Sequence, residues 1–314
     1  MLHLSNRLQL KDLRLIQSIS ETGQLALAAE QLSMTQPAAS RMLANIERAI
    51  GTPVFVRHPK GMKPTPVGEI LARNSMALLN GLDQALLEVD AVGAGRAGSA
   101  RVGAVTGGGM AFIVPAIQEL KKTAAGADIH VDVAPSDVLM DGLLKGDFDF
   151  ILSRIPAGTD ARQFTIRRGR TEVVRFLVRR DHPMAKRSQV KLSDLADYEW
   201  VNQAPHTPLR QAVESAFVTE GIPLPREIVN STSLLVMLAY LVSSDAVAPI
   251  SREVGELLVR GAQAQNLVVL DTVPSIVVNP YHLISRKNQV ISPLAQRLRE
   301  LVLDALDLHK EAAS

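Results

Sequence analysis

Cysteine is absent from this 314-residue chain, and that absence excludes several kinds of chemistry. Without thiols the chain has no disulfides, thiolate zinc sites, iron–sulfur clusters, cysteine nucleophile or thiol redox sensor. Its seven histidines are scattered, with no HExxH sequence and no pair at helical ligand spacing. The G-x-S-x-G and P-loop sequences are missing as well. We therefore expect no metal, no cofactor and no catalytic residues.

Long hydrophobic runs are also missing. The longest apolar run, residues 234–242, has nine residues, whereas a bilayer-spanning helix needs about 20. Residues 1–7 lack the basic start, apolar stretch and small-residue cleavage site of a signal peptide. These absences predict a cytoplasmic protein without membrane contact.

The chain as a whole has little net charge, because its 34 Lys and Arg residues nearly balance its 32 Asp and Glu residues. The distribution is uneven, however. Residues 1–65 hold eight basic and four acidic residues, whereas residues 66–92 hold one Arg and four acidic residues. Local charge decides nucleic-acid affinity, so the first fifth of the chain is the candidate binding module. At about 150 residues per domain, the length predicts two or three domains.

Residues 1–65 predict a winged helix-turn-helix. Apolar spacing indicates helices over residues 9–21 and 24–32, with a turn at residues 33–34. A third helix begins at Thr35, a good N-cap, with Pro37 in its first turn, and ends before Gly51.

The third helix has two contrasting faces. Its apolar stripe, which we expect to be buried, contains Ala39, Leu43, Ile46 and Ile50. The opposite face contains small, amide and arginine side chains: Gln36, Pro37, Ser40, Arg41, Ala44 and Arg48. Such a face suits a major groove, because small residues allow close approach and longer heads reach bases and phosphates. An ordinary amphipathic surface helix has the same periodicity, so the pattern alone leaves both readings open.

Residues 53–65 predict a short strand, a basic turn and a second extended piece. Such a β-wing would place Arg57, Lys60 and Lys63 against the DNA backbone or minor groove. A solvated loop is the alternative for a basic hairpin tip.

The motif string through this region is specific. It reads TQPAASR at residues 35–41, Ile46-Glu47, GTPVFVR at residues 51–57 and PTPVG at residues 64–68. This order resembles the LysR-type transcriptional regulator family almost position by position. The resemblance implies base and backbone contacts from the start of the third helix and from the wing: Thr35, Gln36, Pro37, Ser40, Arg41, Arg57 and Thr65. It also implies an N-terminal all-α winged helix-turn-helix plus linker helix, followed by a two-lobed α/β effector domain of the periplasmic-binding-protein-like type 2 fold.

Residues 66–92 predict one long helix with a near-heptad seam, which Asn74 interrupts: Val67, Leu71, Leu78, Leu82, Leu86 and Val89. Such a helix could pack on its own domain, but beside a helix-turn-helix it favours dimerisation. The resemblance implies a homodimer or homotetramer. The GxGxxG match at residues 93–98 follows a helix and precedes a strand, the reverse of a dinucleotide site, so we interpret residues 93–99 as a hinge.

Residues 100–308 predict the effector domain. Strand and helix patterns alternate as βαβαβ over residues 100–152, a second set begins at residue 172, and a helix over residues 293–308 returns to the first lobe. By resemblance, two strands cross between the lobes, near residues 163–168 and 267–270. The first lobe then covers residues 100–163 and 270–308, and the second covers residues 168–267.

Ligands of open α/β sheets bind beyond the carboxyl ends of strands. This rule selects Thr106, Ser136, Ser153 and Arg154 in the first lobe and Asn202, His206, Thr207, Ser231 and Thr232 in the second. Helix capping is the alternative role for Ser136 and Thr207. Arg154 follows a buried strand, so it meets either an effector carboxylate or an acid across the lobes. The single tryptophan, Trp200, is expected near the cleft.

These features predict a DNA-binding regulator controlled by a small molecule between two lobes. Its partners would be operator DNA, the effector, further copies of the chain and, as a candidate, RNA polymerase. The run at residues 58–69 is similar to a branch that includes regulators of sugar and aromatic-acid catabolism, which implies a sugar, sugar acid or aromatic acid. A cytoplasmic solute-binding protein or a small-molecule enzyme with an accessory helical domain is the alternative.

Overall fold

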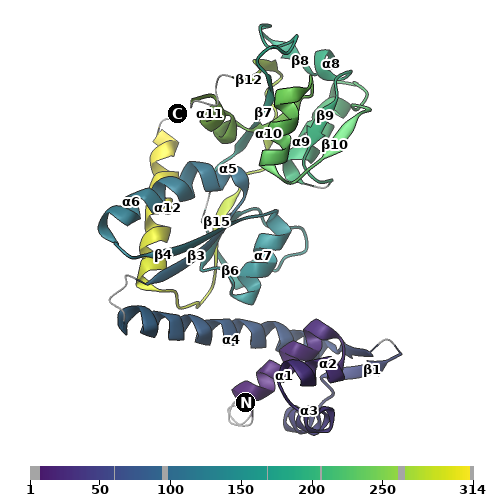
Figure 1. Ribbon diagram of the computed structural model, residues 1–314, viewed down its shortest axis with the longest axis vertical. Coiled ribbons are helices and arrows are strands. Elements are labelled where there is room, and N and C mark those ends of the chain that lie inside the picture. Colours follow the sequence, from purple (N-terminus) through teal and green to yellow (C-terminus); the bar gives the residue numbers. More distant parts are fainter. Residues whose placement is uncertain are drawn as a thin grey trace.

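A computed structural model describes residues 8–59, 61–93, 98–167, 169–205, 207–260 and 266–311. Lys60, His206 and the centre of the expected hinge lie outside the described residues. Figure 1 shows a helical N-terminal domain at one end, a long helix beside it, and two α/β lobes stacked beyond that helix.

The N-terminal domain contains the three expected helices. They are α1 (Leu10–Thr22), α2 (Leu25–Gln31) and α3 (Gln36–Ile50). Thr35 caps α3 by accepting a hydrogen bond from the Ala38 amide, and Gly51 ends it in the left-handed conformation. The helices share one buried core, which includes Leu15, Ile16, Ile19, Ala28, Ala39, Leu43 and Ile46.

The wing is a two-stranded hairpin of β1 (Phe55–His58) and β2 (Gly61–Pro64). Glu47 of α3 holds its base, because Oε1 accepts the Val54 amide at 2.8 Å. Gly61 has φ +129°, and a Cβ there would lie 2.2 Å from the Gly23 carbonyl oxygen. The close approach of β2 to the turn after α1 therefore requires glycine at this position.

Helix α4 (Pro66–Gly93) has two apolar faces. One packs on α1, where Ala72 is buried and Leu71 is partly buried in the core of the N-terminal domain. The other leaves side chains of the expected seam more than half exposed, among them Leu78, Leu86 and Val89. These exposed seam residues therefore contribute little to the fold of this chain, whereas Leu71 of the same seam packs against the N-terminal core.

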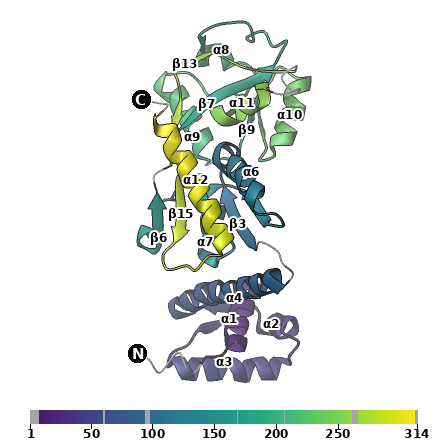
Figure 2. The same cartoon turned by 90° about the vertical axis from the view of Figure 1, so that its left-hand side faces the viewer.

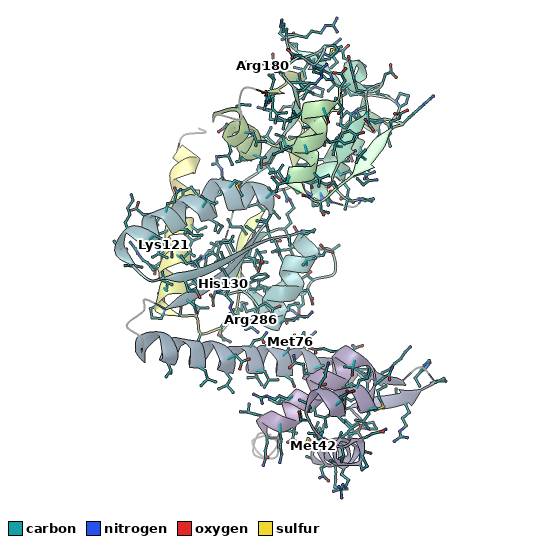
Figure 3. The ribbon with its side chains drawn as sticks, in the orientation of Figure 1. Met42, Met76, Lys121, His130, Arg180 and Arg286 are labelled. Carbon is teal, nitrogen blue, oxygen red and sulfur yellow. The ribbon has the colours of Figure 1, made fainter. Side chains whose placement is uncertain are left out.

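Helix α4 also contacts the first lobe. Asn80 Nδ2 donates to the Lys145 carbonyl and to Asp147 Oδ1, both at 2.9 Å. Figure 3 labels Arg286 on the lobe side of this contact and Met76 on α4. Arg286 Nη1 in turn donates to the Leu144 carbonyl at 3.4 Å.

The first lobe is built on a five-stranded sheet in the order β4-β3-β5-β15-β6. Strand β3 (Ser99–Ala104) is parallel to β4 (Asp128–Val133) and β5 (Phe150–Ser153). Strand β15 (His282–Arg286) is antiparallel to β5 and to β6 (Phe164–Arg167), which follows the short helix η2 (Ala161–Gln163).

The helices of the first lobe cover this sheet, with α12 (Pro293–Glu311) alongside α6 (Val114–Thr123) in Figure 2. Helix α7 (Ser136–Lys145) packs on β5. The run Thr106-Gly107-Gly108-Gly109 predicts a turn after β3, but these residues are helical. Helix α5 (Thr106–Gly108) starts directly after β3 and continues through a π-helical turn, η1 (Gly109–Ile113), into α6.

The second lobe is centred on β7 (Glu172–Arg179). This strand pairs antiparallel with β11 (Ala248–Ser251), β12 (Leu267–Val269) and β14 (Val277–Val278). Strands β9 (Trp200–Asn202) and β10 (Ile228–Asn230) are parallel, as are the short β8 (Val190–Lys191) and β13 (Thr272–Val273). The helices of this lobe are α8 (Leu192–Leu195), α9 (Pro208–Thr219), α10 (Leu234–Ser243) and α11 (Arg252–Arg260).

Two segments cross between the lobes. The first joins β6 to β7, close to the expected position. The second lies at residues 279–281, between β14 and β15, because β12 belongs wholly to the second lobe. The expected crossing at residues 267–270 is therefore wrong. The reason is that β12, β13 and β14 are short apolar stretches whose pairing partners the sequence does not reveal.

The crossing segments are in close contact. The Tyr281 amide donates to the Arg170 carbonyl at 3.1 Å. A Cβ on Gly169 would lie 1.9 Å from the Tyr281 carbonyl oxygen, so this approach requires glycine. Within the described part of the chain, no helix is long and apolar enough to cross a bilayer.

Candidate nucleic-acid interface and ligand cleft

The outer face of α3 is exposed as the helical periodicity predicts. Gln36, Pro37, Arg41, Ala44 and Arg48 are exposed. Ala39, Leu43 and Ile46 are buried on the opposite face, whereas Ile50 at the end of the helix is only half-buried. Burial of one face against α1 and α2 therefore fixes which side chains α3 can offer to a duplex.

The wing presents its two described cations on different faces. In the hairpin register Arg57 pairs with Met62, and Val56 pairs with Lys63. Paired residues share a face and successive pairs alternate, so Arg57 and Lys63 point to opposite sides. Met62 packs against the domain core, which places Lys63 on the solvent side of the ribbon.

Thr65 lies at the junction of the wing and α4. Its hydroxyl donates to the Pro53 carbonyl at 2.9 Å and accepts the Gly68 amide at 3.1 Å. Thr65 therefore ties the wing to the first turn of α4, in agreement with the expected helix start.

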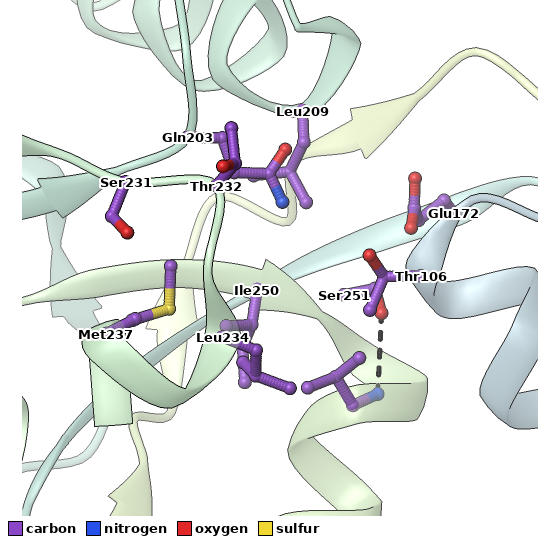
Figure 4. Close-up of a pocket in the computed structure, with 11 residues that line it drawn as sticks. Thr106, Glu172, Gln203, Leu209, Ser231, Thr232, Leu234, Met237, Ile250 and Ser251 are labelled. Carbon is purple, nitrogen blue, oxygen red and sulfur yellow. Dashed lines mark hydrogen bonds between the residues drawn. The ribbon is translucent and has the colours of Figure 1, made fainter. Parts of the chain in front are cut away.

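A small cavity of about 40 Å³ lies where the second lobe meets α5 of the first. Its polar lining, shown in Figure 4, consists of Thr106, Glu172, Gln203, Ser231, Thr232 and Ser251. Its apolar lining consists of Leu209, Leu234, Met237, Ile250 and Val254. That volume holds about three water molecules, so a larger ligand needs the lobes to separate or side chains to turn.

The polar lining comes mainly from strand ends. Thr106 follows β3, Gln203 follows β9, Ser231 and Thr232 follow β10, and Ser251 ends β11. In Figure 4 Glu172, Thr106 and Ser251 group at one end of the cavity, while Ser231 and Met237 lie at the other. The polar lining of this cavity thus coincides with strand ends of the kind that the carboxyl-end rule selects.

Arg154 and Glu172 form a buried ion pair beside the cavity. Arg154 Nη2 donates to Glu172 Oε2, and Nε donates to the Asn279 carbonyl at 2.7 Å. The guanidinium also lies 5.8 Å from the ring centroid of Tyr281. Glu172 is the first residue of β7, so Arg154 pairs with an acid across the lobes, which is the second of the two roles expected for it.

Burial dominates the electrostatics of this region. It raises the pKa of Glu172, while Arg154 lowers that pKa and the nearby Glu253 raises it further. Burial, Glu253 and Glu172 also raise the pKa of Tyr281. The Tyr281 hydroxyl and Glu253 Oε2 are buried without a hydrogen-bond partner among the described residues. The crossing region is therefore a buried, charged cluster next to the cavity.

Family models match both parts of the chain. Residues 10–69 match the bacterial regulatory helix-turn-helix protein of the lysR family, and residues 93–307 match the LysR substrate binding domain. The chain belongs to the LysR family of transcriptional regulators. LysR regulators bind DNA and small-molecule effectors and form oligomers, so the alternative of a solute-binding protein or enzyme is not favoured.

Relatives agree with this assignment. The chain is 38% identical to the HTH-type transcriptional regulator GbpR of Rhizobium radiobacter, over 80% of this chain and 84% of the relative. It is 31% identical to GbpR of Azospirillum brasilense, over 93% and 85%. Full-length CbnR complexed with its target DNA shares the fold, with a TM-score of 0.62 and 19% identity over 95% of this LysR chain and all of CbnR.

The cavity contains only part of the expected effector set. Thr106, Ser231 and Thr232 line it. The others described lie nearby but do not line it: Ser136, Ser153, Arg154, Asn202 and Thr207. Ser136 Oγ accepts the Arg154 amide at 3.4 Å, Ser153 Oγ donates to the Arg154 carbonyl, and Thr207 Oγ1 donates to the Ala204 carbonyl. Thr207 is the N-cap of α9 by position, but its side chain makes no capping bond.

Sequence reasoning missed Glu172, Gln203 and Ser251. Gln203 lies one residue beyond the expected Asn202. The stretch Ala246-Val247-Ala248 predicts a strand that ends at Ala248, whereas β11 runs to Ser251, and for this reason Ser251 was missed. Glu172 begins its strand, so a rule based on strand ends does not select it.

Trp200 does not line the cavity. It is fully buried in the core of the second lobe, between Phe176 and Phe217, with ring centroids at 5.4 Å from each. The expectation that it lies near the cleft as a reporter of ligand is therefore wrong. A buried indole on β9 satisfies its N–H internally, here by donating to the Leu195 carbonyl at 2.9 Å.

Proposed function

We propose that this LysR regulator reads its operator with the exposed face of α3 and anchors on the backbone with the wing. The proposed contacts are Thr35, Gln36, Pro37, Ser40, Arg41, Arg48, Arg57, Lys60, Lys63 and Thr65. The observation that carries this proposal is that α3 has one buried and one exposed face. Ala39, Leu43 and Ile46 are buried, whereas Gln36 and Arg41 are exposed. Amide and guanidinium heads make the bidentate contacts by which bases are distinguished in the major groove.

The proposed organisation follows the predicted boundaries. Residues 1–65 bind DNA, residues 66–92 pair two chains, residues 93–99 form a hinge and residues 100–308 bind effector. The exposed row on α4 supports a homodimer through this helix, and a tetramer is built from two such dimers. We also place the regulator in the cytoplasm, where its operator is accessible.

We propose that the effector binds between the lobes, at the cavity lined by Thr106, Ser231 and Thr232. The proposed site also includes Asn202, which ends β9, and His206 and Thr207, which follow that strand. In the first lobe it includes Ser136, Ser153 and Arg154. Because the closed cavity is small, effector binding and the arrangement of the lobes are coupled. Effector occupancy then changes how two DNA-binding domains sit on their half-sites.

The test measures binding of the full-length protein to the DNA fragment upstream of its own coding sequence. Fluorescence anisotropy of the labelled fragment monitors this binding. We expect binding that is stronger than to a shuffled fragment of equal length and that weakens steeply as salt rises. Equal affinity for the native and shuffled fragments at all salt concentrations would contradict the proposed operator recognition.

A further inference from the structure

A groove of about 780 Å³ lies between α4 and the base of the first lobe. Its α4 wall includes Ala77, Leu78 and Gly81, and its lobe wall includes residues 286–292, which join β15 to α12. A Cβ on Gly81 would meet nothing within 4 Å, so no side chain of the described residues fills the groove at that point. The groove is open to solvent along one side, and this shape suits one face of a helix.

Apolar side chains on both walls of the groove are exposed. Leu78 on α4 is 60% exposed, and Val290 on the lobe is 96% exposed. Leu78 also belongs to the seam through which we propose that two chains pair. The groove is therefore continuous with the proposed pairing surface, and a second helix that covers the seam would border the Val290 segment.

The lobe wall of the groove is positively charged. Within the described ranges, neither Arg286 nor Lys287 forms an ion pair, and Arg286 donates only to uncharged oxygens. Arg162 adds a third cation, although Asp160 pairs with it at 2.9 Å. Asp149 also lines the groove, but its Oδ2 already accepts the Arg101 amide at 2.8 Å. This wall favours a partner with negative charge.

Helix α4 has the complementary charge. Residues 66–92 hold four acidic residues and one arginine, and three of these acids lie within residues 81–93, which contain no cation. A parallel pair of α4 helices would place the two acidic halves side by side. An antiparallel pair places the acidic half of one helix along the first half of the other, where Arg73 lies, and is therefore favoured.

The cations of the lobe wall reach that same stretch of α4. Arg286 lies at the base of the first lobe, on the side that faces α4 (Figure 3). A Cβ on Gly146 would lie 3.2 Å from Arg286 Nη2 and 3.6 Å from Ala77 Cα, so Arg286 is close to the first half of α4. The acidic half of a second, antiparallel α4 would therefore lie near the lobe cations.

We propose that α4 of a second copy of this chain occupies the groove, so that residues 286–292 of one chain contact the α4 helix of the other. The inference rests on the proposed pairing through α4 and adds to it a contact between a lobe and the opposite helix. Arg286 and Lys287 offset the repulsion between two acidic helices, and Val290 covers part of the apolar seam. Each first lobe then touches both helices of the pair, so a movement of the lobe changes how the helices cross.

Crosslinking between chains tests this contact directly. Because the chain lacks cysteine, single-cysteine variants react only at the chosen positions. A tagged chain with Val290→Cys is co-expressed with an untagged full-length chain with Ala85→Cys, and the complex is treated with a short bis-maleimide. We expect a product that joins the two different chains. Val218→Cys in place of Val290→Cys is the matched control and should give none, since Val218 is 70% exposed on α9 of the second lobe.

The strength of association provides a second readout. Val290→Asp should weaken pairing at least about tenfold, because a symmetric dimer loses two contacts with each substitution. Lys287→Glu should weaken it at low salt and have less effect at high salt, where the charges are screened. Sedimentation equilibrium of the full-length protein measures both effects. Val218→Asp and Lys186→Glu, at exposed positions of the second lobe, are the controls.

Absence of the product that joins Val290→Cys to Ala85→Cys would overturn the inference, and this test does not depend on the folding of a charge variant. Unchanged association in folded Val290→Asp and Lys287→Glu would also overturn it. The same holds if the wild type binds tripolyphosphate and Lys287→Glu loses that binding without a change in association, because the groove would then hold a small polyanion.

Failure of this contact is distinguishable from failure of the proposed pairing. Weaker association in Leu86→Asp, with unchanged association in Val290→Asp, removes only the contact of the lobe. A wild-type chain that stays monomeric removes the pairing itself. Selective binding to upstream DNA is measured separately and tests the operator recognition in either case.

Discussion

In the proposed DNA interface, side chains on α3 select bases and side chains on the wing anchor the protein on the DNA backbone. Gln36 and Arg41 lie on the exposed face of a helix whose other face is fixed in the core. Lys63 lies on the outer side of the wing. The ammonium group of a lysine there attracts any phosphate, whatever the DNA sequence. A planar guanidinium or amide group, in contrast, can form hydrogen bonds that distinguish bases.

This division predicts different effects of alanine substitution. Gln36→Ala or Arg41→Ala should each cost about 1–3 kcal/mol of binding free energy and relax selectivity at particular base pairs. Lys63→Ala and Lys60→Ala should weaken all sequences similarly and flatten the salt dependence. Anisotropy on an operator and its single-base variants measures both effects, with Arg226→Ala on the exposed surface of the second lobe as control. A change of base preference in Lys63→Ala would show that the wing reads bases.

His182 gives the second lobe a dependence on pH. Its ring is buried, with Nε2 3.1 Å from the Asp245 carbonyl oxygen and Nδ1 accepting the Met184 amide at 3.1 Å. Burial lowers the pKa of His182, although the Asp245 carbonyl raises it in part. The neutral ring, with its proton on Nε2, is therefore the form that fits the fold.

The sign of the pH effect follows from that lowered pKa. The unfolded chain binds a proton at His182 below about pH 6.5, whereas the folded chain binds it only at lower pH. Stability is therefore present above pH 6.5 and is lost as the pH falls towards the folded pKa, by at most about 1.4 kcal/mol per unit. Urea unfolding at several pH values, followed by the fluorescence of Trp200 in the same lobe, measures this loss.

His182→Gln should flatten the pH dependence, while His130→Gln, at an exposed position of β4, should not. Equal slopes in the wild type and in His182→Gln would rule out His182 as the source.

At the scale of elements, α4 has two roles: one part of its surface packs within the chain, and another is exposed and available for pairing with a second chain. Leu71 and Ala72 pack in the core shared with α1, and Asn80 binds the turn after α7. Leu78 and Leu86 remain more than half exposed. Because their exposure is costly in water, a second copy of α4 is the natural cover in a family that forms oligomers.

Leu86→Asp should therefore weaken dimerisation at least tenfold, by introducing a charge into an apolar seam, while the monomer remains folded. Sedimentation equilibrium measures the association, and circular dichroism checks the fold. Val218→Asp on α9 is a matched control, because Val218 is 70% exposed outside the seam. An unchanged dimer in Leu86→Asp would mean that the chains associate elsewhere.

Elements with strong local signals were predictable from sequence. Helix α3 has a Thr35 cap and a Gly51 end, and α9 begins at Pro208, so local chemistry sets their bounds. The strands after residue 266 carry only short apolar stretches. Their sheet membership depends on partners distant in sequence, and for this reason the second crossing was misplaced.

At the scale of the whole molecule, the two lobes are in direct contact beside the cavity. A Cβ on Gly107 of α5 would lie 2.7 Å from Glu172 Oε1 and 3.0 Å from Ser251 Oγ. Both atoms belong to the second lobe, and Arg154 holds the Glu172 carboxylate through its other oxygen, Oε2. The closed arrangement therefore depends on a missing side chain at this position.

Gly107→Ala should strain the closed arrangement, at a cost of about 1–3 kcal/mol, and shift the protein towards separated lobes. Faster amide hydrogen exchange over residues 106–113 is the measurement. Gly109→Ala, in the next turn, is the control, because its Cβ would meet only ordinary contacts at 3.5 Å or more. Equal exchange in the two variants would show that the lobe contact does not restrain α5.

The sequence by itself determined the family, the order of the domains, the faces of α3 and several of the strand ends that line the cavity between the lobes. These features follow from local periodicity, caps and a long motif string. Only the tertiary structure decided that Arg154 is neutralised by Glu172, that Gly107 lets the lobes meet, and that Trp200 is a core residue. Each of these depends on residues brought together from separate strands, and their pairing is set by packing of the whole chain rather than by any local pattern.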